Sequence, residues 1–341
     1  TGGGQSAFSF YSADTETVSD ALAFSYAVAA EGVAAAVDIA TLAGCTPSET
    51  QPDCALRFIR TLVPRAFRRP ASEVEVAELQ AVYQVGIPEG HEAGLRLVIE
   101  AMLNAPSFAY RTEFGSMVQP GRADLGAYEI AAELSFLLLD SAPDAALLSA
   151  AETGELLRTD GLATQLDRLL ALPEVQRNLT RVVLNWFGAP QVLSKSKADP
   201  AFDEALKSDL VTESRSFVQD QLWSRGGAVS QLITSQRTFV NSRLAAFYGL
   251  SVPDATETTF AAVELPPGQR AGLLTHASIM AMHADVDETS VVLRGKFVRD
   301  EVLCLPPLPP PPAIAGDPEI VAALAAARTE RDRAEYRAGN A

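Results

Sequence analysis

The sequence is poor in the side chains that most often carry catalysis and metal binding. Its 341 residues include 3 histidines and 3 cysteines. It contains no His-Glu-x-x-His pair, no Gly-x-Ser-x-Gly turn and no Gly-x-x-x-x-Gly-Lys loop. These absences argue against a zinc protease, a serine hydrolase built on a nucleophile elbow and a phosphate-binding loop.

Long apolar runs and excess positive charge are also missing. No stretch reaches 18 uninterrupted apolar residues, and the alanine-rich segment from Ala21 to Ala43 carries Glu31 and Asp38. We therefore expect no transmembrane segment. The formal net charge of −16 disfavours nucleic acid and anionic membrane surfaces as partners, because like charges repel. Neutral or cationic partners stay open, and the sequence leaves the oligomeric state unknown.

What the chain does have is helical periodicity. Apolar residues recur at intervals of three and four over most of its length, and strand-like alternation is confined to residues 258–267. This pattern predicts a mainly α fold, a multi-helical array with few short strands and a C-terminal polyproline strap. A capping box at Ser72 and Glu75 opens one helix, and Asn241 caps another. Other helices are expected over residues 17–42, 54–69, 92–103, 125–139, 144–151, 160–172, 173–187, 200–223, 269–282, 290–303 and 318–337.

Residues 115–124, GSMVQPGRAD, form the clearest linker in the sequence. We place a domain boundary there. The expected division is an N-terminal helical unit in residues 1–116, a central helical domain in residues 121–252 and a C-terminal helical segment in residues 253–341.

Cys45 and Cys54 flank a short polar loop. Cys45 follows Gly44, a good helix C-cap, and Cys54 opens the next expected helix. A disulfide between them would stabilise the fold by about 3 kcal/mol and would indicate an oxidising compartment. The alternative is two free thiols in a cytosolic protein. No metal site is expected, because no histidine lies nearby in sequence. Cys304 is left over, and an odd cysteine in an exported chain invites a partner.

Two histidines are candidates for chemistry. His276 and His283 are seven apart on an expected helix, too far apart for adjacent turns to bind one metal ion. His283 is followed by Asp285, Asp287 and Glu288, which suggests an acid-base or cation site. The alternative is an exposed acidic loop before a helix that begins at Ser290.

Two further segments have open roles. Arg65, Arg68 and Arg69 form the densest basic cluster, which could clamp an anion or form structural ion pairs. The proline tract begins two residues after Cys304 and should adopt polyproline II, either as a ligand for an aromatic groove or as a strap on the protein's own surface. Its prolines are Pro306, Pro307, Pro309, Pro310, Pro311 and Pro312.

Three groups of segments follow one another along the chain. They are CALRFIRTLVPRAFRRPASEVEVAEL with LRLVIEAMLNAPSFAYRTEFG, then YEIAAELSFLLLDSAPDAALLSAAETGEL running on to FVNSRLAAFYGL, then AGLLTHASIMAMHADVDETSVVLRGKFVRDEVLCLPPLPPPP. In this order they resemble a set of uncharacterised domains that occur in tandem in large exported proteins of planctomycetes and myxobacteria, commonly beside c-type cytochrome domains. The resemblance runs from about Asp14 onward. Asn104-Ala105-Pro106-Ser107-Phe108 departs slightly from the pattern of the first domain, and Thr289-Ser290-Val291 stands where the third usually has Thr-Ser-Pro.

The resemblance implies export, so that a signal has been removed and the protein is periplasmic, outer-membrane-associated or extracellular. In similar proteins the helix after the proline tract leads into a Cys-x-x-Cys-His haem-attachment motif. That motif does not occur in residues 1–341, so we expect no cofactor on them. The resemblance implies a haem c on a downstream or partner segment, with His276 and His283 as candidates to approach it.

The resemblance transfers no activity residue by residue, and three functions stay open. The first is a scaffold or electron-transfer component that houses or accompanies a c-type haem segment, with a cytochrome domain or another protein as partner. The second is a structural or assembly subunit of a cell-surface or extracellular complex. The third is a haem-dependent oxidoreductase or an extracellular polymer hydrolase, with His283, Asp285, Asp287 and the arginine cluster as its site.

Overall fold

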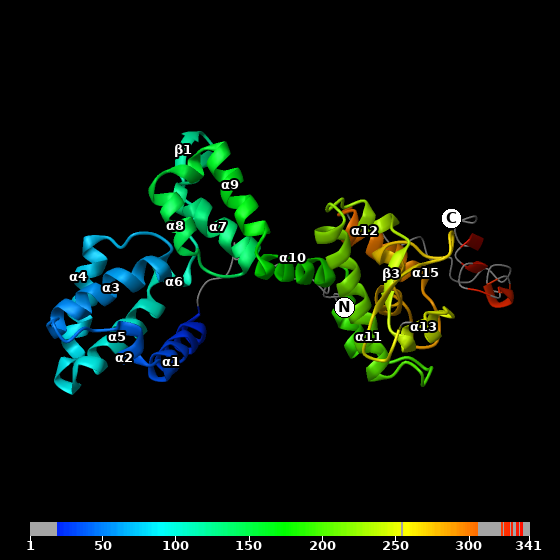
Figure 1. Ribbon diagram of the computed structural model, residues 1–341, viewed down its shortest axis with the longest axis horizontal. Helices are drawn as coiled ribbons and strands as arrows, with labels where there is room; N and C mark the ends of the chain where they lie inside the picture. Colours follow the sequence, from blue (N-terminus) through cyan, green and yellow to red (C-terminus); the bar gives the residue numbers. More distant parts are fainter. Residues whose placement is uncertain are drawn as a thin grey trace. The chain divides into compact units, whose positions relative to one another are not determined.

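The computed structural model describes residues 19–253 and 255–305, together with 322, 324–327, 329, 332–333 and 335–336. The fold is mainly helical, as predicted (Figure 1). Within these residues, the strands form two small antiparallel sheets of two strands each. No helix in the described part of the chain is long and apolar enough to cross a membrane. The proline strap, Pro306 to Pro312, lies outside the described residues.

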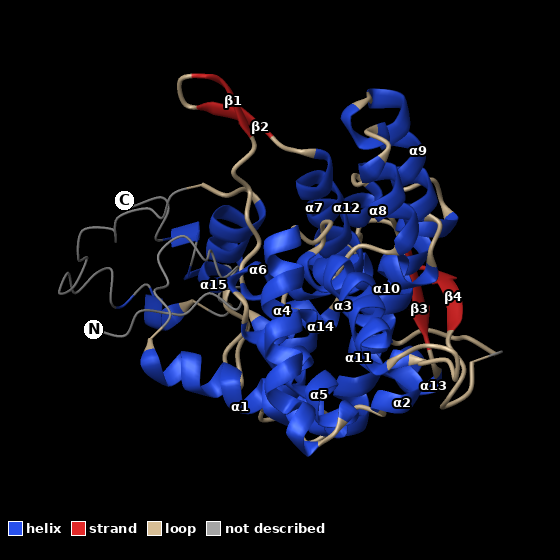
Figure 2. Cartoon of the chain, turned by 90° about the vertical axis from the view of Figure 1, so that its left-hand side faces the viewer, coloured by secondary structure: helices blue, strands red, loops and turns tan. Residues whose placement is uncertain are grey.

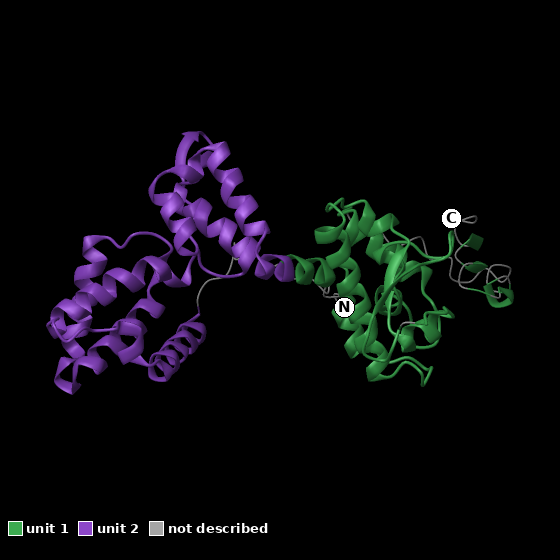
Figure 3. Cartoon of the chain, in the orientation of Figure 1, with its two compact units in different colours: residues 1–11, 179–341 green, residues 12–178 purple. Residues whose placement is uncertain are grey.

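The chain folds into two compact units that divide between Asn178 and Leu179 (Figure 3). The division falls inside helix α10 (Pro173–Trp186). The expected three-part organisation places its boundaries elsewhere, near residues 116–121 and 252, and stays a prediction.

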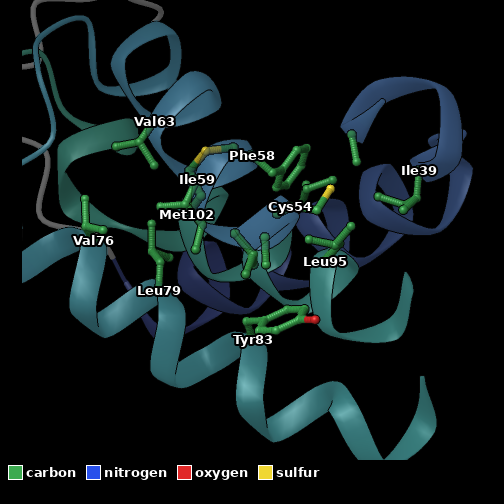
Figure 4. Close-up of a cluster of buried hydrophobic side chains, with 14 of the residues drawn as sticks. Ile39, Cys54, Phe58, Ile59, Val63, Val76, Leu79, Tyr83, Leu95 and Met102 are labelled. Carbon is green, nitrogen blue, oxygen red and sulfur yellow. The ribbon is translucent and has the colours of Figure 1, made fainter. Parts of the chain in front are cut away.

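The first unit, residues 12–178, is built from helices that cover one another's apolar faces. The disulfide half-cystine Cys54 belongs to its core, among Phe58, Ile59 and Leu95 (Figure 4). The helices are α1 (Asp20–Ala36), α2 (Ile39–Ala43), α3 (Gln51–Phe67), α4 (Glu73–Gly86), α5 (His91–Asn104), α6 (Pro106–Ala109), α7 (Ala127–Leu139), α8 (Ala145–Glu152) and α9 (Thr159–Leu170), with short 3-10 turns at Ile87–Glu89 and Glu155–Leu157.

Local sequence signals set most of these helix boundaries. The capping box at Ser72 and Glu75 is present at the start of α4. The single helix expected over residues 17–42 is wrong, because it is interrupted after Ala36. The carboxylate of Asp38 accepts a hydrogen bond from the Thr41 backbone N–H and caps a new helix, α2. A side chain that satisfies a free backbone donor in this way competes with continuation of the preceding helix.

The segment expected to be a linker forms a hairpin. Strand β1 (Ser116–Gln119) pairs antiparallel with β2 (Arg122–Asp124), and both strands are exposed throughout (Figure 2). Gly121 in the turn has φ +79°, a conformation that side chains with a Cβ rarely adopt. The sequence predicts a linker over residues 115–124, whereas the structure has two short paired strands there, joined by a turn.

The second unit, residues 179 onward, packs helices around a two-stranded sheet. Strand β3 (Arg237–Val240) pairs with β4 (Ala261–Glu264), which lies within the segment predicted to be extended. Besides the end of α10, its helices are α11 (Glu204–Gln219), α12 (Gln231–Thr234), α13 (Ser242–Tyr248), α14 (Ala277–Met282) and α15 (Val291–Phe297); its 3-10 turns are Ala189–Ser194 and Leu273–Thr275, and its π turns are Asp220–Ser224 and Val298–Val302.

The long helix expected over residues 269–282 is also wrong. Gly272 has φ +64° and lies against the backbone of Ile233, where a Cβ would clash. The chain therefore cannot be helical there, and α14 begins only at Ala277. The predicted short helix after Asn241 is confirmed: the Asn241 amide oxygen accepts from the Leu244 N–H, and Gly249 ends the helix.

Candidate functional site

The second unit contains a cavity of about 990 Å³ whose lining residues all lie between 197 and 303. It is bordered by α14, the loop of residues 284–289, α15 and the segment before α11. Its apolar lining includes Phe202, Phe247, Leu274, Met280, Val286 and Leu303. We call this cavity the groove. Its size and apolar lining are those of a site for a large organic ligand or a partner's side chains.

Cationic side chains border the groove. Arg270 lies over the ring of Tyr248, 4.4 Å from its centroid. Arg294 lies on α15, and its Nε donates to the backbone oxygen of Ser290. Two guanidinium groups beside an apolar surface suit a ligand that carries carboxylates, since guanidinium forms paired hydrogen bonds with them.

The acidic loop of the groove is held by a lysine. Nζ of Lys197 donates to the backbone oxygens of Ala284 at 2.8 Å and Asp285 at 2.6 Å. Burial lowers the pKa of Lys197, while the nearby Asp285 carboxylate opposes that shift. An ammonium group thus lies at the start of the loop, beside the residues for which the sequence suggested a cation site. Glu288 instead accepts a hydrogen bond from Arg333.

A buried carboxyl lies in the core of the same unit. The Glu213 side chain on α11 accepts hydrogen bonds from the Tyr248 hydroxyl at 2.6 Å and the Thr238 hydroxyl at 2.7 Å. Burial raises the pKa of Glu213 to about 7, although both hydroxyls favour the charged form. Burial likewise raises the pKa of Tyr248 well above its usual value.

His276 lies in that core and not on the face of a helix. It is the residue before α14, its Nδ1 is 3.1 Å from the Ser214 hydroxyl, and its ring contacts Phe217 edge-on. Burial lowers the pKa of His276 to about 3, so the ring is neutral at physiological pH. It does not line the groove.

His283 is at the other end of α14. Its ring stacks on Phe297 with centroids 4.1 Å apart, and burial lowers its pKa. It does not line the groove either. The two histidines therefore bracket a six-residue helix instead of sharing one face of a long one. Asp285 and Asp287 are exposed and do not join His283 in a metal-binding group within the described residues.

The disulfide predicted between Cys45 and Cys54 is confirmed in the first unit, with their Cα atoms 5.5 Å apart. A third side chain lies at this site, and it could not be predicted because it is distant from both cysteines in the sequence. Nε2 of His91, at the start of α5, is 3.3 Å from Sγ of Cys45. No local motif links His91 to the cysteines, because the fold of α2, α3 and α5 brings them together.

The arginine cluster divides into three different environments. Arg68 is only 7% exposed and donates to the backbone oxygens of Ser107 and Tyr110, each at 2.7 Å. Arg69 forms a paired contact with Glu75, and its guanidinium lowers the pKa of that carboxyl to about 2. Arg65 is exposed. Two of the three arginines thus stabilise the first unit itself: Arg68 holds the backbone of residues 107–110, and Arg69 binds Glu75 of the capping box.

Cys304 is an exposed free thiol.

A second cavity, of about 730 Å³, lies in the first unit beside Arg111. Glu113 and Glu133 both line it, and their side chains are hydrogen-bonded to each other. Burial and this contact raise the pKa of Glu133. Glycosidase carboxyls stand about 5 Å or more apart, so direct contact between these two does not match that chemistry.

Three family models match the chain in tandem, and each is described as a protein of unknown function. They are PSD5 (DUF1595) over residues 54–113, PSD4 (DUF1592) over residues 125–250 and PSCyt3 (DUF1588) over residues 270–341. Domains of this set are known as cytochrome-c-associated modules of planctomycete type. Neither a curated protein nor a solved structure matches the chain. The PSD4 match crosses the division between the two compact units, and the PSCyt3 match contains α14 and α15 of the groove.

Proposed function

We propose that this protein is an exported helical scaffold that accompanies a c-type haem module lying outside residues 1–341, and that the groove is where the haem module docks. The observation that carries the proposal is the groove itself, which has an apolar lining with Arg270 and Arg294 at its border, while its carboxylates are Asp199 and those of the loop of residues 284–289. The disulfide supports export, because such bonds persist in oxidising compartments. The tandem order of the three matched modules supports the cytochrome association.

The chemistry of a haem edge suits this lining. A haem c carries a flat apolar macrocycle and two carboxylate side chains. Phe202, Phe247 and Met280 offer apolar contact, while the two arginines offer charge-assisted hydrogen bonds. Burying apolar surface and pairing carboxylates at one edge would orient the module as well as bind it.

Neither His276 nor His283 is placed to ligate the iron of a haem. His276 is buried against Phe217 and Ser214, and His283 stacks on Phe297. The chain also has no Cys-x-x-Cys-His sequence. The proposed role is therefore to position a haem module and not to hold its iron.

Titration of a haem c peptide into the protein tests the docking. Val286 and Leu303 line the groove and are 59% and 58% exposed, so Val286→Glu and Leu303→Glu should leave the fold intact. A carboxylate at either position should weaken binding about tenfold or more, since it meets both apolar surface and the ligand's carboxylates. Binding is followed through the haem absorption band.

Val85→Glu is the matched control, because Val85 is 73% exposed and lies on α4 in the other unit. It should bind as the parent does. Equal weakening by all three substitutions, or no binding by the parent protein, would count against docking in the groove.

The assembly alternative has one observation in its favour. Helix α1 is rich in apolar residues, and it leaves Phe24 71% exposed, with Tyr26 and Val28 also exposed. Exposed apolar surface of this kind marks protein contact sites. If it drives self-assembly, Phe24→Glu should lower the mass measured by light scattering, whereas a parent that is monomeric at all concentrations would remove the alternative.

A further inference from the structure

The disulfide of the first unit lies beside a third side chain that binds metals. The Sγ atoms of Cys45 and Cys54 and one ring nitrogen of His91 all lie within 4.8 Å of one another. They form the one such group of potential ligands that the described residues contain. Two thiolates and an imidazole are a donor set that suits Zn²⁺ and other thiophilic ions.

The loop that carries Cys45 is held in place by contacts other than the S–S bond. Nη2 of Arg57 donates to the backbone oxygens of Ala43 at 3.0 Å and Gly44 at 3.1 Å. The same guanidinium forms two hydrogen bonds with Glu49, at 2.7 and 3.1 Å. Both ends of the loop are thus anchored to α3, the helix that carries Cys54. Breaking the S–S bond leaves these anchors, so the two sulfurs stay close together.

His91 is oriented by a residue of the core. Its Nδ1 is 2.7 Å from the hydroxyl of Tyr83, which is itself buried on α4. When Nδ1–H donates to that hydroxyl, the lone pair of Nε2 is directed at Cys45. A histidine ligand commonly has its second nitrogen fixed by such a hydrogen bond.

We propose that Cys45, Cys54 and His91 form a three-ligand site for a thiophilic cation when the disulfide is reduced, with water in the fourth position. The reductant is a dithiol: two electrons and two protons pass to the disulfide, and the dithiol becomes a disulfide itself. Binding of Zn²⁺ then displaces the two thiol protons. Arg57 favours this step because its Nη2 is 3.5 Å from Sγ of Cys54 and stabilises a thiolate there. The inference uses neither the groove nor a haem module, and it applies where a dithiol reduces this bond.

Cobalt(II) is the probe, since thiolate ligation gives it a charge-transfer absorption band. The full chain carrying Cys304→Ser, which removes the third thiol, is reduced with a water-soluble phosphine that becomes its oxide. Co²⁺ is then titrated in. We expect one equivalent to bind with a charge-transfer band and with tetrahedral ligand-field bands. The same protein left oxidised should show neither.

His91→Ala in the same background should weaken Co²⁺ binding by about 100-fold or more, and Tyr83→Phe by about tenfold. Glu92→Ala is the matched control, because Glu92 is exposed beside His91 and should leave the affinity unchanged. Far-ultraviolet circular dichroism checks that the reduced protein keeps its helices. The proposal is overturned if reduction unfolds the first unit, if no charge-transfer band forms, or if His91→Ala binds as tightly as its parent.

Discussion

The two units accommodate interior polar groups in opposite ways. In the first, permanently charged arginines donate to backbone oxygens: Arg68 to Ser107 and Tyr110, and Arg96 to Ala34 and Val37. In the second, Glu213 and His276 are buried, and neither forms an ion pair with any residue that the structure describes. Burial shifts both toward their neutral forms.

This difference means that the two units should respond to different perturbations. Arginine stays charged at every ordinary pH, so the contacts of Arg68 and Arg96 with backbone oxygens should be insensitive to pH and sensitive to truncation. The second unit depends on two groups that titrate within the ordinary range. Three substitutions test this contrast, in decreasing order of expected effect.

Arg68→Ala should cost the most, about 4 kcal/mol of unfolding free energy. It removes hydrogen bonds from a charged donor to the partly buried backbone oxygens of Ser107 and Tyr110, at about 1.5–3 kcal/mol each. Arg65→Ala is the matched control, because Arg65 is exposed in the same cluster and should change stability by less than about 0.5 kcal/mol. Chemical denaturation of both variants provides the measurement. Equal effects would show that Arg68 does not hold residues 107–110.

Glu213→Gln should change how stability depends on pH. In the folded protein the pKa of Glu213 is about 7, against an ordinary value of 4.5. Folding therefore binds a proton between these values, and the contribution of Glu213 to stability is lost as pH rises through about 7. Glutamine cannot lose a proton. The unfolding free energy of the variant relative to the parent should thus rise by about 3 kcal/mol between pH 4.5 and 7.

His276 gives the opposite slope, because its pKa is lowered from 6.5 to about 3, so its contribution is present above pH 6.5 and lost as pH falls. In the Glu213→Gln variant, where Glu213 no longer titrates, the unfolding free energy should therefore fall steeply as the pH is lowered from 6.5 toward about 3. Glu264→Gln, at an exposed position on β4, is the control and should run parallel to the parent. Parallel curves for Glu213→Gln as well would refute the assignment.

Cys45→Ser should lower the unfolding free energy by about 2.5 kcal/mol, the loop-entropy value for a short crosslink. The decrease in unfolding free energy should be confined to the first unit, since both cysteines lie there. Calorimetry of the full chain can separate it from the second unit. A loss seen equally in both units would contradict a role confined to the first unit.

Local signals were readable from the sequence. The capping box at Ser72, the cap at Asn241 and the loop between Cys45 and Cys54 each depend on a few neighbouring residues, and each formed as predicted. Asp38 is also a residue that favours a helix N-cap, but the apolar pattern continues through it and predicts one uninterrupted helix.

The groove and the surroundings of the histidines were not predictable, because they depend on residues far apart in sequence. Lys197 meets the loop at Ala284 only through the fold, and His91 meets Cys45 in the same way. Gly272 shows the limit of periodicity: helical spacing continues through it, but close approach to Ile233 excludes a helix. The PSD4 match likewise spans the two compact units, so sequence similarity does not mark where packing divides the chain.

The most direct test of the proposed function is a reduced-minus-oxidised visible spectrum, with intact mass, on the protein purified from its native source. The account predicts a c-type α band that purifies with this chain and a mass that identifies the haem-bearing segment or partner. A pure protein with no haem band, and no haem c peptide bound in its groove, would contradict it.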